Sequence, residues 1–117
     1  MRPVKIEHNG TLMRIFISES ARHGKRSVEA VVVEALAAAG LAGAVAFKGI
    51  EGFGRSGVVS SHRSSDAWMD LPIVIEVIDE DEKIAAALPA LEGILGDALV
   101  TLEHVQTVLF RRGDAEA

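Results

Sequence analysis

Apolar and polar positions alternate along the chain in a pattern that separates strands from helices. Short runs of apolar, β-favouring residues occupy 12–17, 44–47 and 72–78. The third run begins with a proline, which a strand tolerates at its first position. Near the C-terminus, 99–102 and 105–110 predict a last strand or two short ones.

The first helix is predicted between the first two strands, where apolar residues recur at steps of three and four. Ser27 is a suitable N-cap, and Gly40, directly after the last apolar position, is an expected C-terminal stop. The buried stripe comprises Val28, Val31, Val32, Ala35, Leu36 and Ala39. Because valine and alanine dominate, packing rather than propensity must stabilise this helix.

A second helix is predicted after the strand that begins with proline. Asp79 is expected to cap it, with Glu82 three residues later in a capping-box arrangement. The buried stripe comprises Ile84, Leu88, Leu91 and Leu95. Pro89 removes one backbone donor inside the helix, so we expect a bend there. Gly93 and Gly96 are expected to end the helix.

The resulting order, β-α-β-β-α-β, predicts an α+β, ferredoxin-like fold in which two helices cover one face of an antiparallel sheet. We expect a single domain over 1–117, with a core at about 12–112 and flexible ends at 1–10 and 113–117. Residues 55–71 are polar and are expected to form a long loop. Since such a sheet leaves one face and its edges uncovered, the pattern favours an oligomer.

Charge and composition narrow the possible function classes. The 117 residues carry a formal net charge of −5, whereas nucleic-acid-binding domains are usually basic, so no nucleic-acid partner is expected. The absence of cysteine excludes disulfides and thiolate chemistry. No apolar run approaches the roughly 18 residues of a membrane span, and no signal peptide is recognisable. We therefore expect a cytoplasmic protein without direct membrane insertion.

The stretch 47–57 holds four of the eleven glycines and matches the pattern G-x-G-x-x-G at Gly52, Gly54 and Gly57. In a dinucleotide site a helix follows this pattern directly. Here the sequence continues with residues 58–61, Val-Val-Ser-Ser, which have poor helix propensity and exclude that site. Two interpretations remain. Either backbone donors and Arg55 hold an anion, or the glycines permit a bulge or a sharp strand exit.

Several motifs within this order resemble PII signal-transduction proteins. They are Gly40-Leu41-Ala42-Gly43, Lys48, Gly52-Phe53-Gly54-Arg55, Gly96-Asp97 and Arg111-Arg112-Gly113. A closer resemblance, over roughly 12–112, is to the PII-like family of uncharacterised proteins called domain of unknown function 190. It rests on Arg14-Ile15-Phe16-Ile17, Gly49-Ile50-Glu51-Gly52-Phe53-Gly54 and Asp70-Leu71-Pro72-Ile73-Val74-Ile75-Glu76.

This resemblance implies a homotrimer of PII-like subunits that acts as a regulator and not as an enzyme. In PII proteins adenine nucleotides bind in clefts between subunits, and a long loop contacts a partner; here that loop would be 55–71. The residues implied to bind a small anionic ligand are Lys48, Gly52, Phe53, Gly54, Arg55, Gly96, Asp97 and Arg111, with Arg112 nearby. Family members are often encoded beside ion transporters, which implies a membrane-transporter partner.

Three departures from PII proteins limit what the resemblance implies about the ligand. The chain has no tyrosine, so the tyrosine modification of PII loops is impossible. Ser56 stands where PII proteins have a glutamine used for metal and 2-oxoglutarate, and Ala98 stands where a phosphate-contacting lysine is expected. The resemblance therefore implies the position of the cleft, with an adenine nucleotide as one candidate ligand and no certain cofactor.

Individual residues are compatible with two other functions. Four histidines (His8, His23, His62 and His104) suggest a metal-handling trimer like the copper-tolerance (CutA) proteins of similar fold, although no pair has a compact ligand spacing. His62, Asp66 and a nearby serine could serve a small hydrolase, although all lie in one loop without an elbow motif. Both functions remain as alternatives to the regulator.

Overall fold

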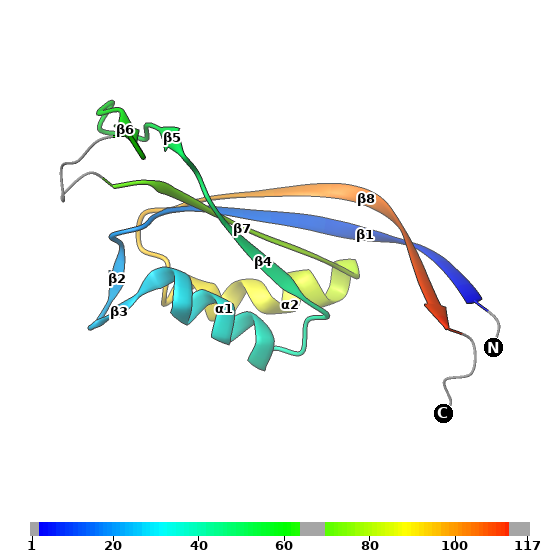
Figure 1. Cartoon of the computed structure of the whole chain (residues 1–117). Helices are drawn as coiled ribbons and strands as arrows, with labels where there is room; N and C mark the ends of the chain where they lie inside the picture. Colours follow the sequence, from blue (N-terminus) through cyan, green and yellow to red (C-terminus); the bar gives the residue numbers. More distant parts are fainter. Residues whose placement is uncertain (1–2, 64–69, 113–117) are drawn as a thin grey trace.

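The computed structural model describes residues 3–63 and 70–112 and has an α+β fold. Four strands form the main sheet in the order β4-β7-β1-β8, and every neighbouring pair is antiparallel. They are β1 (Pro3–Ser18), β4 (Ala44–Lys48), β7 (Pro72–Asp79) and β8 (Leu99–Arg112). The helices α1 (Val28–Ala38) and α2 (Asp81–Glu92) both lie on one face of this sheet (Figure 1). The predicted ferredoxin-like arrangement is confirmed.

Two small sheets complete the described part of the chain. β2 (Arg22–His23) pairs with β3 (Arg26–Ser27) directly before α1. β5 (Glu51–Gly52) pairs with β6 (Ser60–Ser61), so that part of the predicted 55–71 loop is a short strand. Among the described residues, no helix is both long and apolar enough to cross a membrane.

The predicted ends of α1 are confirmed. The Oγ of Ser27 accepts the backbone N–H of Ala30 at 3.2 Å and satisfies one of the unpaired donors at the start of the helix. After the last turn, Gly40 has a φ of 83°, a left-handed conformation that favours glycine. Local sequence signals were sufficient here because both ends depend on residues adjacent to the helix.

The predicted cap of α2 is wrong. Glu80 is the N-cap and makes no side-chain capping bond, whereas Asp79 ends β7. The carboxylate of Asp79 accepts the N–H of Glu80 at 2.7 Å and that of Ala42 at 2.9 Å, which ties the loop before β4 to the start of α2. Burial, the largest single effect, would raise the pKa of Asp79, but these two backbone donors together with the charges of Lys83 and His8 outweigh it, so the pKa is lowered. The contact with Ala42 spans 37 residues and leaves no local signal.

The hydrophobic core lies between the helices and the sheet. Every second residue of the two central strands points to the helices and is buried: Met13, Ile15, Ile17, Ile73, Ile75 and Val77. The helices contribute Val28, Val32, Leu36, Ile84, Ala87 and Leu91. Because successive strand side chains point to opposite faces, a charged residue such as Arg14 fits within β1 without entering the core.

The other face of the sheet is uncovered within the described chain. Its large apolar side chains are 37% to 62% exposed and comprise Phe16, Val45, Phe47, Ile78 and Leu99. On the same face Arg14 binds Glu76, with 2.8 Å between Nε and Oε2, and lies 3.4 Å from Glu103. Exposed apolar patches of this kind mark interaction surfaces. The face is therefore a candidate surface for the expected oligomer.

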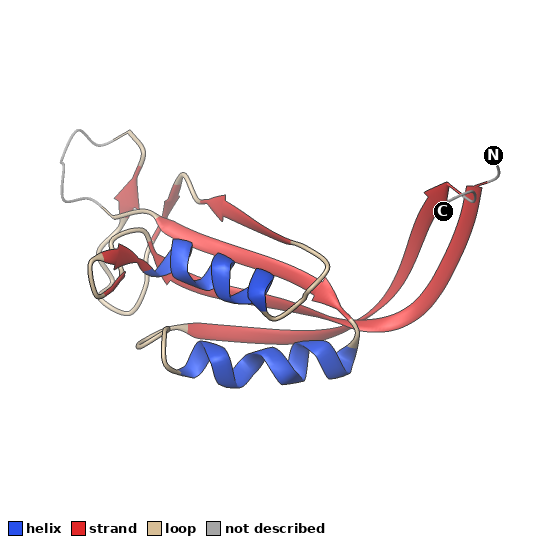
Figure 2. Ribbon diagram, turned by 90° about the horizontal axis from the view of Figure 1, so that it is seen from below, coloured by secondary structure: helices blue, strands red, loops and turns tan. Residues whose placement is uncertain are grey.

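β1 and β8 continue beyond the sheet as a two-stranded arm formed by 3–9 and 106–112 (Figure 2). β7 pairs with β1 only from Thr11 onward, whereas β8 pairs with it back to Pro3. The prediction of a frayed lead-in at 1–10 is therefore wrong for residues 3–10, and β8 is one continuous strand. The strand pairing involves residues about a hundred positions apart, which local composition does not reveal.

Gly10 occupies the junction between the arm and the sheet. A Cβ on this residue would lie 2.7 Å from the carbonyl oxygen of Asp79, so the backbone would have to move. We expect Gly10→Ala to lower the free energy of unfolding by about 1–3 kcal/mol. Gly43→Ala is the matched control, since a Cβ there meets nothing within 4 Å. Urea unfolding followed by circular dichroism compares the two variants; equal stabilities would contradict the close crossing.

Candidate functional site

The glycine-rich stretch leaves β4 beside the start of β7. Gly49 donates its N–H to the carbonyl oxygen of Pro72 at 2.7 Å, and a Cβ on Gly49 would lie 2.7 Å from the Pro72 Cγ. Glycine therefore permits a close approach of this backbone to the Pro72 ring. Further along, Gly57 has a φ of 76° and donates to the carbonyl oxygen of Gly54 at 3.0 Å, which closes a turn. β6 follows this turn, and no helix opens as a dinucleotide fingerprint would require.

A cleft of about 700 Å³ opens beside this stretch. Its walls come from the end of β1, from the glycine-rich stretch and the residues after it up to β6, from the entry to β7, and from residues 97–99 at the start of β8. The lining residues are Phe16, Ile17, Ser18, Gly52, Phe53, Gly54, Arg55, Ser56, Val58, Ser60, Asp70, Leu71, Pro72, Asp97, Ala98 and Leu99. Aromatic and aliphatic surface with a few polar groups is typical of small-molecule sites.

The structure brings five of the eight predicted ligand residues to this cleft. They are Gly52, Phe53, Gly54, Arg55 and Asp97. The guanidinium of Arg55 lies 3.7 Å from the carboxylate of Asp97, and both side chains are almost fully exposed. Because an exposed ion pair of this length contributes little to stability, both groups are available to a ligand.

The other three predicted residues do not line the cleft. Lys48 forms an ion pair with Glu19, and the hydrogen bond from Lys48 lowers the pKa of that carboxyl. Gly96 has a φ of 57° and supplies the turn directly before Asp97. Arg111 is exposed on the arm, in the part of β8 that extends past the end of β7.

Asp70 and Ser20 form a contact at the cleft that the sequence did not reveal. The carboxylate of Asp70 accepts the backbone N–H of Ser20 at 2.8 Å and its hydroxyl at 2.5 Å. Beside this contact, Glu19 donates its N–H to the carbonyl oxygen of Leu71 at 2.9 Å. The only sequence signal was the position of Asp70 at the start of the family motif before β7.

The charged groups of the cleft do not balance. Among the described lining residues, Arg55 is the one cation, while Asp70 and Asp97 are both carboxylates. A second cation such as Lys48, which would neutralise the cleft, is held by Glu19 outside the lining. The cleft of a single chain therefore carries a net negative charge.

Within the described part of the chain, the histidines considered for metal binding and hydrolysis do not gather into a metal site. The Nδ1 of His62 lies 3.1 Å from the carbonyl oxygen of Ile50, and the backbone N–H of His62 donates to the same oxygen at 2.8 Å. Asp66, its suggested partner, lies outside the described residues. Within the described ranges, no group of three or more histidine, aspartate and glutamate residues could hold a metal ion.

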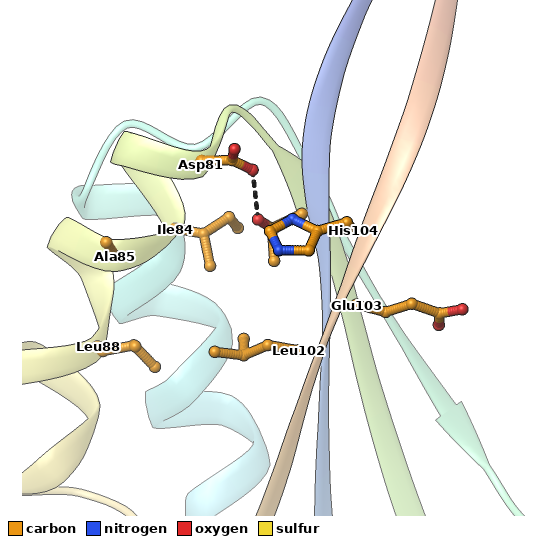
Figure 3. A pocket seen from close by; sticks show the side chains of 8 residues that line it. Asp81, Ile84, Ala85, Leu88, Leu102, Glu103 and His104 are labelled. Atoms are coloured by element: carbon orange, nitrogen blue, oxygen red, sulfur yellow. Dashed lines mark hydrogen bonds between the residues drawn. The ribbon is translucent and has the colours of Figure 1, made fainter.

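A second, smaller pocket of about 210 Å³ lies between α2 and β8 (Figure 3). Ile84, Ala85 and Leu88 approach it from the helix, and Leu102 faces them from the strand. At its edge the hydroxyl of Thr11 donates to the carboxylate of Asp81 at 2.6 Å. None of the predicted ligand residues lines this pocket.

Comparisons with known proteins agree with this architecture. The family model DUF190, described as "Uncharacterized ACR, COG1993", matches residues 10–107. The chain belongs to the DUF190 family. A UPF0166 protein of Aquifex aeolicus (strain VF5) is 34% identical to this DUF190 protein over 97 residues, which are 83% of this chain and 91% of the relative.

Solved structures with the same fold include PII-like proteins. CPII of Thiomonas intermedia K12, described as a nitrogen regulatory PII-like protein bound to ADP, AMP and bicarbonate, is 17% identical with a TM-score of 0.61; the match covers 87% of this chain and 91% of CPII. A putative PII-like signalling protein from Thermus thermophilus is 24% identical with a TM-score of 0.59, over 92% and 93% of the two chains. At these identities the likeness shows the fold, so this DUF190 protein has a PII-like fold.

Proposed function

We propose that this DUF190 protein is a cytoplasmic, non-enzymatic PII-like regulator that binds a small anionic ligand between the subunits of a homotrimer. The observation that carries the proposal is the cleft, where Gly52, Gly54 and Arg55 meet Asp97, which is far from them in the sequence. An adenine nucleotide is the first candidate ligand, because CPII, which shares the fold, is described as bound to ADP and AMP. Its phosphates would accept hydrogen bonds from the backbone N–H groups of the glycine-rich stretch and from Arg55.

The charge of the cleft supports a site that a second subunit completes. An anion in the cleft of one chain meets one cation and two carboxylates, and the cation already faces Asp97. Binding of a phosphate therefore requires an additional positive group. We assign this role to Arg111 of a neighbouring copy. Arg111 is exposed and makes no ion pair with a described residue of its own chain.

The arm supports delivery of Arg111 to a neighbour. Beyond Gly10 it is a two-stranded ribbon whose exposed apolar side chains have no cover within the described chain: Val4, Ile6, Val108, Leu109 and Phe110. A two-stranded ribbon alone is only marginally stable, so a second copy that covers it would stabilise it. Cyclic contacts of this head-to-tail kind close into rings such as trimers.

The 55–71 loop is the proposed partner-contacting switch. Its first residues, including Arg55 and Ser56, line the cleft, and its last residues, Asp70 and Leu71, return to the same cleft. A ligand held there contacts both ends of the loop and would change the order of the residues between them. Residues 64–69 lie outside the described part of the chain. A membrane transporter is the partner class that the family resemblance implies.

Calorimetric titration with ADP tests the binding site. Arg55→Ala is expected to weaken ADP binding about 10- to 100-fold, because a hydrogen-bonded charged contact is lost. Lys25→Ala is the matched control: it removes an exposed cation outside the cleft and should bind ADP like the wild type. The proposal fails if Arg55→Ala and wild type bind ADP equally, or if native mass spectrometry finds only monomers.

A further inference from the structure

Asp70 is a carboxylate in a cleft proposed to bind an anion, and its position calls for a physical explanation. Unlike Asp97, which faces Arg55, it makes no ion pair with a described residue. Its two bonds come from the N–H and the hydroxyl of Ser20, one to each carboxylate oxygen. An ionised carboxylate has about four acceptor positions, so about two remain for a ligand.

The contacts around Asp70 hold this acceptor in one place. Ser20 binds both carboxylate oxygens through a backbone and a side-chain donor, which restricts rotation of the carboxylate. The following residue, Leu71, is anchored through its carbonyl oxygen by the N–H of Glu19. Both contacts join the entry of β7, which lines the cleft, to the loop that directly follows β1. The acceptor is therefore positioned before any ligand arrives, which lowers the entropic cost of binding.

The chemistry of a carboxylate decides which part of a ligand it can contact. It only accepts hydrogen bonds when ionised, so it repels phosphate and attracts hydroxyl or amino donors. Protein carboxylates bind ribose hydroxyls in this way in dinucleotide-binding folds. A ligand with an anionic end and a donor-rich end would thus be oriented by two opposed charges in one cleft, Arg55 and Asp70.

We propose that Asp70, positioned by Ser20, is a specificity-determining residue that accepts a hydrogen bond from a hydroxyl or amino group of the nucleoside part of the ligand. The phosphates point to Arg55 in this arrangement. The inference rests on the proposed nucleotide-binding function. It adds that the cleft selects nucleotides over inorganic phosphates, because only a ligand with suitable donors satisfies the remaining acceptor positions of Asp70.

The test compares ADP with inorganic pyrophosphate, which has the phosphates but no nucleoside. Asp70→Asn in the full chain is expected to weaken ADP binding about 10- to 100-fold and to leave pyrophosphate binding unchanged or tighter. Ser20→Ala should weaken ADP binding in the same direction but less. Glu92→Gln is the control for the loss of one negative charge, since Glu92 is exposed outside the cleft. Circular dichroism melting establishes that the variants are folded.

Nucleotide analogues identify the donor. If a ribose hydroxyl is the donor, 2′-deoxy-ADP or 3′-deoxy-ADP binds the wild type weakly, and Asp70→Asn weakens that analogue no further. If the amino group of the base is the donor, inosine diphosphate binds the wild type weakly, and Asp70→Asn weakens its binding no further. The inference is overturned if Asp70→Asn binds ADP as tightly as the wild type, or if it weakens ADP and pyrophosphate equally. In those cases, weaker ADP binding by Arg55→Ala than by the wild type still supports the proposed function. If the wild type binds neither ADP nor pyrophosphate, both the inference and the proposed function are refuted.

Discussion

A trimer of Arg55→Ala subunits is expected to lose most of its affinity for ADP, and so is a trimer of Arg111→Ala subunits. A mixed trimer that contains both kinds of subunit is expected to regain ADP binding in about one cleft in three. The reason is the position of the two arginines. Arg55 lines the cleft, whereas Arg111 lies on the arm that extends past the end of β7. If each cleft takes Arg55 from one copy and Arg111 from its neighbour, one interface of every mixed ring contains both residues.

Co-expression of the two variants with different tags, followed by purification through both tags and calorimetric titration, measures the recovered sites. Mixing wild type with the double variant provides the control. If each site is shared between two copies, about a sixth of the clefts in these mixed trimers remain intact. If each site lies within one chain, about half of them remain intact. Failure of the two single variants to complement each other would show that Arg111 is not delivered by a neighbour, while the role of Arg55 would be unaffected.

The second large effect concerns stability. Ile75→Ala is expected to lower the free energy of unfolding by about 2–5 kcal/mol, because the side chain is fully buried between the sheet and the helices and its loss leaves a cavity. Ile78→Ala, three residues along the same strand, should cost less than about 1 kcal/mol, since Ile78 is 46% exposed.

Urea unfolding at two protein concentrations separates burial within the chain from burial between copies. The loss in Ile75→Ala should be the same at both concentrations, because its neighbours belong to one subunit. Ile78 lies on the uncovered sheet face, so its replacement should instead reduce the concentration dependence of stability if that face is an interface between copies. Equal losses in the two variants at low concentration would contradict the assignment of the core to one face of the sheet.

Much of the fold followed from local patterns. The runs of β-favouring residues at 12–17 and 72–78 predicted the two central strands, and Ser27 and Gly40 predicted both ends of α1. The failures share a different cause. Pairing of residues 3–10 with β8 and the bond from Ala42 to Asp79 join positions far apart in the chain, and neither leaves a period or a capping motif in its own segment.

The candidate site was predicted in outline only. The family motifs indicated the glycine-rich wall and Asp97, which the structure brings together around one cleft. They did not predict that Lys48 is held by Glu19, or that Asp70 is held by Ser20. These side chains have several chemically equivalent partners in the sequence, and only their distances in the folded chain select one.

The sequence by itself determined the α+β order, the buried stripes of the helices and the family, because periodicity and short motifs are local properties of a chain. Only the tertiary structure decided that β1 and β8 extend into an arm, that Arg111 lies on it, and that the cleft of one chain is net negative. These features depend on which distant residues meet in space. Long-range strand pairing and charge balance arise only when the chain is folded, so composition and spacing do not contain them.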